Sequence, residues 1–310
     1  MTAISVVMGV YNAAATLAAT LDSILGQTEN DFECIVVDDG STDATPVTLA
    51  NYAGRDPRIR VIRQANAGLT RALIAGCAAA RGVYIARHDA GDLSDPRRFA
   101  LQKRALDGDA TVVFVSSATQ YAGPELEPLW ITRPTGAALQ PAHVLDLTIP
   151  GALTDGPTHH GSVMFRRDAY ERAGGYRAAF YYGQDFDLWL RLAEAGKFQG
   201  IDNVLYTARI TPDSISGSAR SRQEELGRLS RAALDARQRG ESEADILARA
   251  AAITGLSGRP IASRGNGLYF IGEALRRNGD HRARRYLRQS IAAWPWSMRA
   301  WIRYFQSLVL

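Results

Sequence analysis

Two carboxylates follow a short apolar run in the first third of the chain. Residues 83–86 predict a β-strand, and Asp89 and Asp92 come after it, set around Gly91. A parallel strand delivers its last residues into the ligand crevice, where acidic groups are well placed to hold a cation. Mg²⁺ uses one or two protein carboxylates and completes its shell with water and phosphate. The segment therefore favours a metal–phosphate site, with a solvated acidic turn as the alternative.

Polar residues also follow two earlier apolar runs. Residues 4–8 lead to Tyr11, and residues 34–37 lead to Asp39. Stretches with a helical period separate these runs, so that strand and helix alternate four times in about 90 residues. This alternation predicts a mostly parallel sheet with helices on both faces, and ligands bind such sheets outside the carboxyl ends of their strands.

The glycine-rich phosphate loops of the common nucleotide-binding folds are missing from the sequence. No Gly-x-Gly-x-x-Gly follows the first predicted strand, and no Gly-x-x-x-x-Gly-Lys-Ser/Thr occurs. A nucleotide would need other contacts. Asp39 can accept a hydrogen bond from a base N–H, Tyr11 can supply a ring, and a metal ion can neutralise a diphosphate.

A longer series of segments matches one enzyme family. The segments are 4–12, 23–28, 32–43, 66–69, 82–92, 96–98 with Gln102, 160–167, 174–176 and 184–191. Over about residues 3 to 220 the chain resembles the family 2 glycosyltransferases, which are inverting enzymes of the GT-A fold that use nucleotide-sugar donors. The resemblance implies a Rossmann-like GT-A domain over residues 1–215. The remaining residues, 216–310, are predicted to form an α-helical, Arg-rich appendage after a turn-forming hinge.

The resemblance assigns donor-binding roles to several positions. Asp39 matches the residue that hydrogen bonds the donor base, with Gly9, Tyr11 and Arg71 nearby. Asp89 begins the family's Asp-x-Asp motif, which contacts the ribose and the metal-bound diphosphate. The implied cofactor is a divalent metal ion, Mg²⁺ or Mn²⁺.

Further residues match the acceptor side of the family. Asp185 matches the general base that takes the proton of the acceptor hydroxyl, and the resemblance places His160, Gln184 and Trp189 on that side. For Trp189 a position in the core is the alternative. The pair His159 and His160 lacks the spacing of a metal cage, so a structural or solvent-facing role competes with a metal role.

Two departures from the family pattern bear on function. Gly91 stands where the family has its second motif carboxylate, so Asp89 or Asp92 must hold the ion, or metal dependence is weaker than usual. Gln184 replaces a glutamate beside Asp185. The leading hypothesis is an inverting transferase that moves a sugar to a hydroxyl of a glycan or lipid-linked acceptor in cell-surface polysaccharide synthesis. The alternative is a nucleotide-sugar-binding protein of the same fold with weak or lost activity.

Composition adds an expected location. The chain has 310 residues, 46% of them apolar, which permits a sizeable core. Cys34 and Cys77 lie in a predicted strand and helix, as buried free thiols would, and no secretory segment or run of 18 apolar residues occurs. These features favour a cytoplasmic protein, with the inner face of the plasma membrane as one location.

The C-terminal region concentrates positive charge. Residues 263–310 contain nine Arg and two acidic residues, giving +7, which leaves −3 for the rest of a chain of net charge +4. Helices are predicted at 219–239, 243–254, 265–278, 280–292 and 297–310. The last has an apolar stripe made of Met298, Trp301, Ile302, Phe305, Leu308 and Val309. The stripe either lies on an anionic membrane or packs on the preceding helices. Nucleic acid is not expected as a partner, because the core lacks a basic aromatic platform.

Overall fold

The computed structural model describes residues 2–134, 156–212, 220–253 and 261–308. The chain divides into two compact units. Unit 1 comprises Met1–Thr119, Arg133–Thr207 and Gln223–Thr254, and unit 2 comprises Gln120–Thr132, Ala208–Arg222 and Gly255–Leu310. The boundary predicted between residues 215 and 216 lies outside the described residues, as does most of the predicted hinge.

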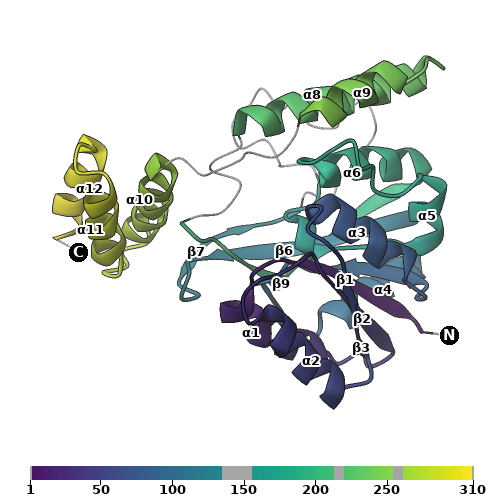
Figure 1. Cartoon of the computed structure of the whole chain (residues 1–310), viewed down its shortest axis with the longest axis horizontal. Helices are drawn as coiled ribbons and strands as arrows, with labels where there is room; N and C mark the ends of the chain where they lie inside the picture. Colours follow the sequence, from purple (N-terminus) through teal and green to yellow (C-terminus); the bar gives the residue numbers. More distant parts are fainter. Residues whose placement is uncertain (1, 135–155, 213–219, 254–260, 309–310) are drawn as a thin grey trace. The chain divides into compact units, whose positions relative to one another are not determined.

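A mixed sheet, mostly parallel in its first part, forms the centre of unit 1 (Figure 1). Its strands are β1 (Ile4–Val10), β2 (Phe32–Asp38), β3 (Ile59–Arg63), β4 (Tyr84–Arg87), β5 (Leu93–Ser94), β6 (Val112–Ala122), β8 (Val163–Arg166) and β9 (Lys197–Arg209). The order is β3-β2-β1-β4-β8-β6-β9-β5, and the first four strands pair in parallel. The carboxyl ends of β1, β2 and β4 therefore meet at one edge of the sheet.

Helices cover both faces of this sheet, as predicted. They are α1 (Ala14–Leu25), α2 (Thr45–Arg55), α3 (Leu69–Ala78), α4 (Arg98–Gly108), α5 (Arg167–Arg172) and α6 (Gln184–Ala195). Successive strand residues point to opposite faces. Val6 of β1 accordingly packs in one cluster with Leu17 of α1, whereas Val7 packs in another with Leu73 of α3. Figure 1 shows α1 and α2 on one side of the sheet and α3 and α6 on the other.

The antiparallel strands bring later parts of the chain to the end of β4. β8 pairs with β4 and begins directly after the short helix η2 (His160–Ser162). β9 pairs with β5 in a register that sets Tyr206 opposite Ser94. The segment before η2 and the second half of β9 thereby reach the acidic turn between β4 and β5.

Two described helices that follow the sheet lie in unit 1, the first of them from Gln223 onward. They are α8 (Arg220–Gln238) and α9 (Ala244–Ala252). Leu226 and Leu229 of α8 and Ala250 of α9 are buried with Phe180, in the loop that precedes α6. Ion pairs from Arg177 to both Asp187 of α6 and Glu243 fasten the same loop.

Among the described residues, three whole helices and a short strand lie in unit 2. They are β7 (Pro128–Thr132), α10 (Ile261–Arg277), α11 (Ala283–Ala293) and α12 (Met298–Ser307). Their core includes Leu129, Ile271 and Leu287. The five helices predicted in the C-terminal region are confirmed as α8 to α12. None of the helices in the described part of the chain combines the length and the apolarity that crossing a bilayer requires.

The apolar stripe of α12 does not pack on the preceding helices. Ala300 and Ser307 are the fully buried residues of this helix, whereas Met298 is 75% exposed and Phe305 59% exposed. The packing alternative is therefore wrong for the described part of the stripe. Val309 lies outside the described residues.

Candidate active site

The acidic turn after β4 is held in shape by helix α1. Thr20 Oγ1 accepts a hydrogen bond from Gly91 N (3.0 Å) and donates one to the carbonyl oxygen of Asp92 (2.9 Å). Gly91 has φ +102°, a conformation that residues with a side chain rarely adopt. A residue with a carboxylate side chain would strain this turn at position 91. The backbone conformation therefore explains why glycine stands where the family has its second motif carboxylate.

Tyr206 of β9 joins the two carboxylate residues of the turn. Its hydroxyl donates to Asp92 Oδ2 (2.8 Å) and accepts from Asp89 N (3.0 Å). Its ring stacks on His159, with centroids 5.4 Å apart. The side chain is only 1% exposed, so these contacts are fixed by packing.

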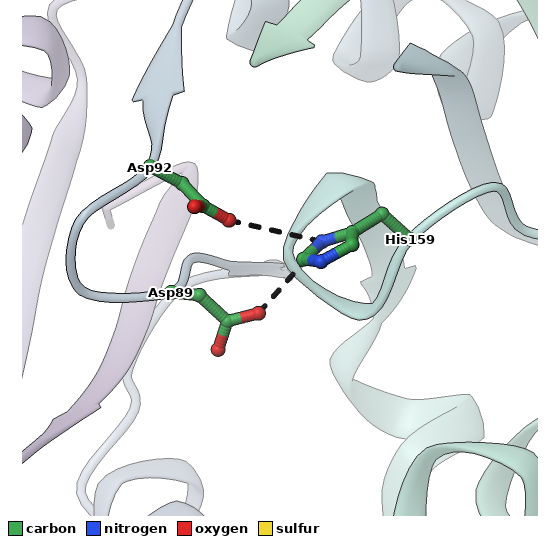
Figure 2. Close-up of side chains that lie close together, drawn as sticks. All are labelled: Asp89, Asp92 and His159. Carbon is green, nitrogen blue, oxygen red and sulfur yellow. Dashed lines mark ion pairs between the residues drawn. The ribbon is translucent and has the colours of Figure 1, made fainter. Parts of the chain in front are cut away.

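His159 is the third polar group at this turn. Figure 2 shows both carboxylates directed toward its imidazole ring, which comes from the segment before η2. His159 Nδ1 lies 3.8 Å from Asp89 Oδ2 and 3.8 Å from Asp92 Oδ2. Burial lowers the pKa of His159, although Asp89 opposes that effect, so the ring is neutral near pH 7. A neutral imidazole is the form that binds metal ions.

This trio fits a divalent cation. One ligand atom from each of Asp89, Asp92 and His159 lies within 4.8 Å of the others, and two oxygens with one imidazole nitrogen suit Mn²⁺ or a similar ion. His159 Nδ1 accepts a hydrogen bond from Gly161 N (3.0 Å), which orients the ring, and this nitrogen would bind an ion only in place of that hydrogen bond. The predicted metal residues, Asp89 and Asp92, are thus brought together, and His159 joins them.

A buried arginine supports the trio from behind. Arg87, at the end of β4, forms an ion pair with Asp89 Oδ1 and donates to Val7 O (3.1 Å) and His160 Nε2 (3.3 Å). Burial by itself would raise the pKa of Asp89, but Arg87 and the neighbouring histidines outweigh it and hold that pKa well below its usual value. Asp89 is therefore a carboxylate throughout the physiological range.

His160 packs beside Arg87, behind Asp89. It is 8% exposed, and its Nε2 lies 2.7 Å from the Tyr176 hydroxyl as well as near Arg87. Burial lowers its pKa well below the usual value, with the Arg87 charge acting in the same direction. The residue predicted on the acceptor side thus packs behind Asp89, and its neighbour in sequence faces the carboxylates.

A second buried arginine joins three segments of the site. Arg98 of α4 donates to Arg87 O (2.7 Å), Gly161 O (2.8 Å) and Ser94 Oγ (2.9 Å). Its Nε donates to Gln102 Oε1 (3.0 Å), and burial lowers the pKa of Arg98 to about 10. The end of β4, the η2 segment and β5 therefore share one donor group, which fixes their relative positions.

The predicted base-binding residue is held at the end of β2. Asp39 is 3% exposed, and its carboxylate accepts hydrogen bonds from Gln64 Nε2 (2.7 Å), Ala67 N (2.9 Å) and Gly68 N (2.8 Å). A Cβ on Gly68, which has φ +89°, would lie 2.9 Å from the Tyr181 ring. The carboxylate is thus fixed in place next to a closely packed loop.

The other predicted donor residues lie around the same strand ends. Tyr11 follows β1 and is 52% exposed, and Arg71 on α3 is also exposed. Gly9 is buried in β1, where an added Cβ would lie 3.0 Å from Leu69 Cδ1. Gly9 therefore permits close packing of α3 on the sheet, and the two exposed side chains are free to reach a ligand.

Asp185 stands in the first turn of α6. Its Oδ1 accepts a hydrogen bond from Phe186 N (2.9 Å). Burial raises the pKa of Asp185, and the charge of Asp89 raises it further. Asp185 and Asp89 come from distant parts of the sequence, and the fold brings the charge of Asp89 close enough to affect Asp185. A carboxylate with a raised pKa is suited to accept a proton.

Two further predicted acceptor residues are buried. Gln184 is 7% exposed at the start of α6. Trp189 is 6% exposed and belongs to the core cluster that includes Leu188 and Phe165. Trp189 therefore occupies a position in the core, which is the alternative given for it above, because so little of its ring is exposed for contact with an acceptor.

Comparison with known proteins identifies the family. The model of glycosyl transferase family 2 matches residues 5–174. The chain belongs to this family. It is a family 2 glycosyltransferase with the GT-A fold, as the sequence resemblance implies. The matched range holds the predicted donor and metal residues but ends before Asp185.

Individual relatives agree with this assignment. The chain is 35% identical to EpsE of Bacillus subtilis over 226 residues, which is 68% of this chain and 74% of EpsE. It is 26% identical over 213 residues to the chondroitin synthase of Pasteurella multocida, covering 69% of this chain but 21% of that protein. The chain therefore spans about a fifth of the length of that synthase.

A solved structure has the same fold. The crystal structure of S. aureus TarS 1-349 in complex with UDP matches 98% of this chain and 88% of that chain, with a TM-score of 0.53 and 14% sequence identity. At this identity the likeness concerns the fold alone.

Several residues of this site have no distinctive pattern in the sequence. His159 is one of two adjacent histidines, and nothing in their spacing selects it over His160. Tyr206 lies within a strand whose pattern gives no chemical signal. Arg87 sits at the end of a strand, where a buried arginine is not expected from its polarity.

Proposed function

We propose that this family 2 glycosyltransferase is an inverting enzyme that moves a sugar from a nucleoside-diphosphate sugar to a hydroxyl of a glycan or lipid-linked acceptor. Cell-surface polysaccharide synthesis is the process in which such an enzyme acts, and the similarity to EpsE and to a chondroitin synthase supports it. The observation that carries the proposal is the geometry of the acidic turn, where ligand atoms of Asp89, Asp92 and His159 lie within 4.8 Å of one another. Burial raises the pKa of Asp185, the proposed base, and the charge of Asp89 raises it further.

The donor diphosphate is proposed to bind at the acidic turn. Asp89, Asp92 and His159 would hold a divalent ion there, and such an ion supplies charge stabilisation to the leaving diphosphate. Tyr206 and Arg98 keep the turn and the histidine segment in place through the contacts described above. Arg87 neutralises part of the acidic charge that would otherwise repel a diphosphate.

The nucleoside is proposed to lie at the ends of β1 and β2. Asp39 offers carboxylate oxygens to a base N–H, while the exposed Tyr11 and Arg71 can contact the ring and the ribose. Hydrogen bonds from Ala67 N and Gly68 N fix the orientation of the Asp39 carboxylate before the donor arrives. Such preorganisation reduces the entropy lost on binding.

Asp185 is proposed to accept the proton of the acceptor hydroxyl as that oxygen attacks the anomeric carbon. Its raised pKa makes it a stronger base than an ordinary aspartate. An inverting reaction needs a single base opposite the leaving group, and no glycosyl-enzyme bond forms. Asp89 forms an ion pair with Arg87, so Asp185 is the carboxylate proposed to accept the proton.

The proposal is tested by nucleotide release from a panel of UDP, GDP, dTDP and CDP sugars, with oligosaccharide or lipid-linked acceptors and with Mn²⁺, Mg²⁺ or EDTA. Asp185→Asn should lower kcat by about 100- to 10,000-fold, which is the usual contribution of a general base. It should still bind the nucleotide, seen as a raised melting temperature. Asp168→Asn, an exposed acid in the first turn of α5, is the matched control and should retain full activity.

The alternative, a nucleotide-sugar binder without transfer, predicts a different pattern. The melting temperature would rise with a nucleotide, yet no donor and acceptor pair would release it, and Asp185→Asn would change nothing. Near-normal turnover of Asp185→Asn would remove the assignment of the base.

A further inference from the structure

Exposed apolar side chains are concentrated near the C-terminus. Of fifteen large hydrophobic residues with exposed side chains in the described part of the chain, seven lie between residues 294 and 308. Six of them are named here the aromatic face, namely Trp294, Trp296, Met298, Trp301, Ile302 and Phe305. Scattered exposed apolar residues are normal, but a contiguous group of this kind marks an interaction surface.

The aromatic face is held in a fixed shape by polar contacts. Ser297 caps the start of α12, where its hydroxyl accepts from Ala300 N (3.4 Å), and Arg284 donates to Ser307 O (2.9 Å) at the other end. Trp301 Nε1 donates to Pro295 O (2.9 Å), and the Trp301 ring stacks on Phe305 at 5.9 Å. These contacts order the side chains without covering them.

Residue size explains why this face is directed outward. Residues 300, 304 and 307 share one side of α12, and Ala300 and Ser307 are small enough to pack closely on α10 and α11. Tyr304 packs partly against the same core. The bulky apolar residues lie on the opposite side, away from the core that the described residues of unit 2 form.

The positive charge around the aromatic face favours an anionic partner. From His281 to the end of the chain there are six Arg and no acidic residue. Three of these arginines form ion pairs with acidic residues that precede this stretch, namely Arg282 with Asp280, Arg285 with Glu125 and Arg303 with Glu273. Arg288 and Arg299 form no ion pair within the described residues, and Arg299 lines a hollow of about 340 Å³ together with Trp296 and Met298. A second copy of this chain would bring two such cationic surfaces together, which disfavours self-association through this face.

We propose that the aromatic face binds the surface of a bilayer that contains anionic phospholipids, with α12 lying in the plane of the interface. Tryptophan is favoured at this depth because its ring is apolar and its N–H is polar. Arginines beside the face would meet the lipid phosphates, as in other amphipathic helices that bind membranes without spanning them. This inference does not depend on the transferase activity.

The test is co-sedimentation of the full chain with phosphatidylcholine vesicles that contain or lack phosphatidylglycerol. The wild-type protein should bind the anionic vesicles, and the tryptophan emission should shift to shorter wavelength. Trp301→Glu with Phe305→Glu should weaken binding by about a hundredfold, because two inserted apolar groups are replaced by charges. Arg288→Ala with Arg299→Ala should weaken it by about fivefold for each cation removed.

Val47→Glu is the matched control, because Val47 is also exposed and apolar but lies on α2 in unit 1. It should leave vesicle binding unchanged. Absence of wild-type binding, or equal binding by Trp301→Glu with Phe305→Glu, would overturn the proposal. A wild-type dimer that the same double variant converts to a monomer would overturn it in favour of self-association. Quenching of the wild-type tryptophan emission by lipids brominated on their acyl chains checks insertion without any variant, and absence of quenching contradicts it.

Discussion

Replacing Tyr206 by phenylalanine isolates the contact that joins the acidic pair. The ring volume is kept, while the hydrogen bonds to Asp92 Oδ2 and from Asp89 N are both lost. A hydrogen bond to a charged group contributes about 1.5–3 kcal/mol, and a buried N–H left without its partner costs about 1–3 kcal/mol. We therefore expect Tyr206→Phe to lose about 2.5–6 kcal/mol of folding free energy.

The loss should be visible in two independent assays. For a unit of this size each kcal/mol shifts the melting temperature by about 2–4 °C, so a decrease of about 5–24 °C is expected by calorimetry. In the transferase assay the concentration of Mn²⁺ or donor that gives half-maximal rate should rise about tenfold, because the Asp92 carboxylate and the backbone N–H of Asp89 both lose the hydroxyl that holds them. The value of kcat should change less, since Asp185 is untouched.

Tyr286→Phe provides the matched control for this experiment. Tyr286 is 2% exposed in unit 2, and its hydroxyl donates to Glu127 Oε1 at 2.5 Å. Its loss should lower the melting temperature and leave the dependence on metal and donor unchanged. If Tyr206→Phe matched the wild type in both assays, or if Tyr286→Phe changed the metal dependence equally, the proposed role of Tyr206 would be refuted.

Three further outcomes follow from burial and charge. Because burial and Asp89 raise the pKa of Asp185, kcat/KM measured against pH should fall on the acid side at a pH above the ordinary aspartate value of 3.8, as the base becomes protonated. Glu273→Gln should lower the melting temperature at pH 7, because arginines of the same helix lower the pKa of Glu273 to about 2 and its charge stabilises the fold. The difference in melting temperature between variant and wild type should shrink as the pH falls from 4.5 toward 2, because the carboxylate is then protonated. Gly161→Ala should lower the melting temperature and donor affinity together, because its Cβ would lie 1.9 Å from the Tyr206 hydroxyl oxygen.

Much of the fold could be predicted because its signals are local. Apolar runs that end in polar residues predicted β1, β2 and β4, and helical spacing predicted α1 and α3, because each pattern reflects a single element meeting the core. The parallel order then implied that Asp39 and Asp89 lie at one edge of the sheet. Burial of Cys34 and Cys77 without a disulfide was also predictable from their positions in these elements.

The identity of the groups around Asp89 could not be predicted in this way. Arg98, His159 and Tyr206 approach the turn from a helix, a loop and an antiparallel strand, and their places depend on pairing between strands far apart in the chain. Sequence spacing alone makes His160 as good a candidate as His159. Only the η2 turn decides that one faces the carboxylates and the other lies behind Arg87.

The sequence by itself determined the family, the alternation of strands and helices, and the carboxylates that end the strands, because these are properties of residues close together in the chain. Tertiary structure decided which side chains meet those carboxylates, and which side of α12 is buried. Periodicity shows that a helix has an apolar stripe, but the choice of the buried side depends on which residues fit closely against neighbouring helices. Ala300 and Ser307 fit there, so the bulky stripe is exposed.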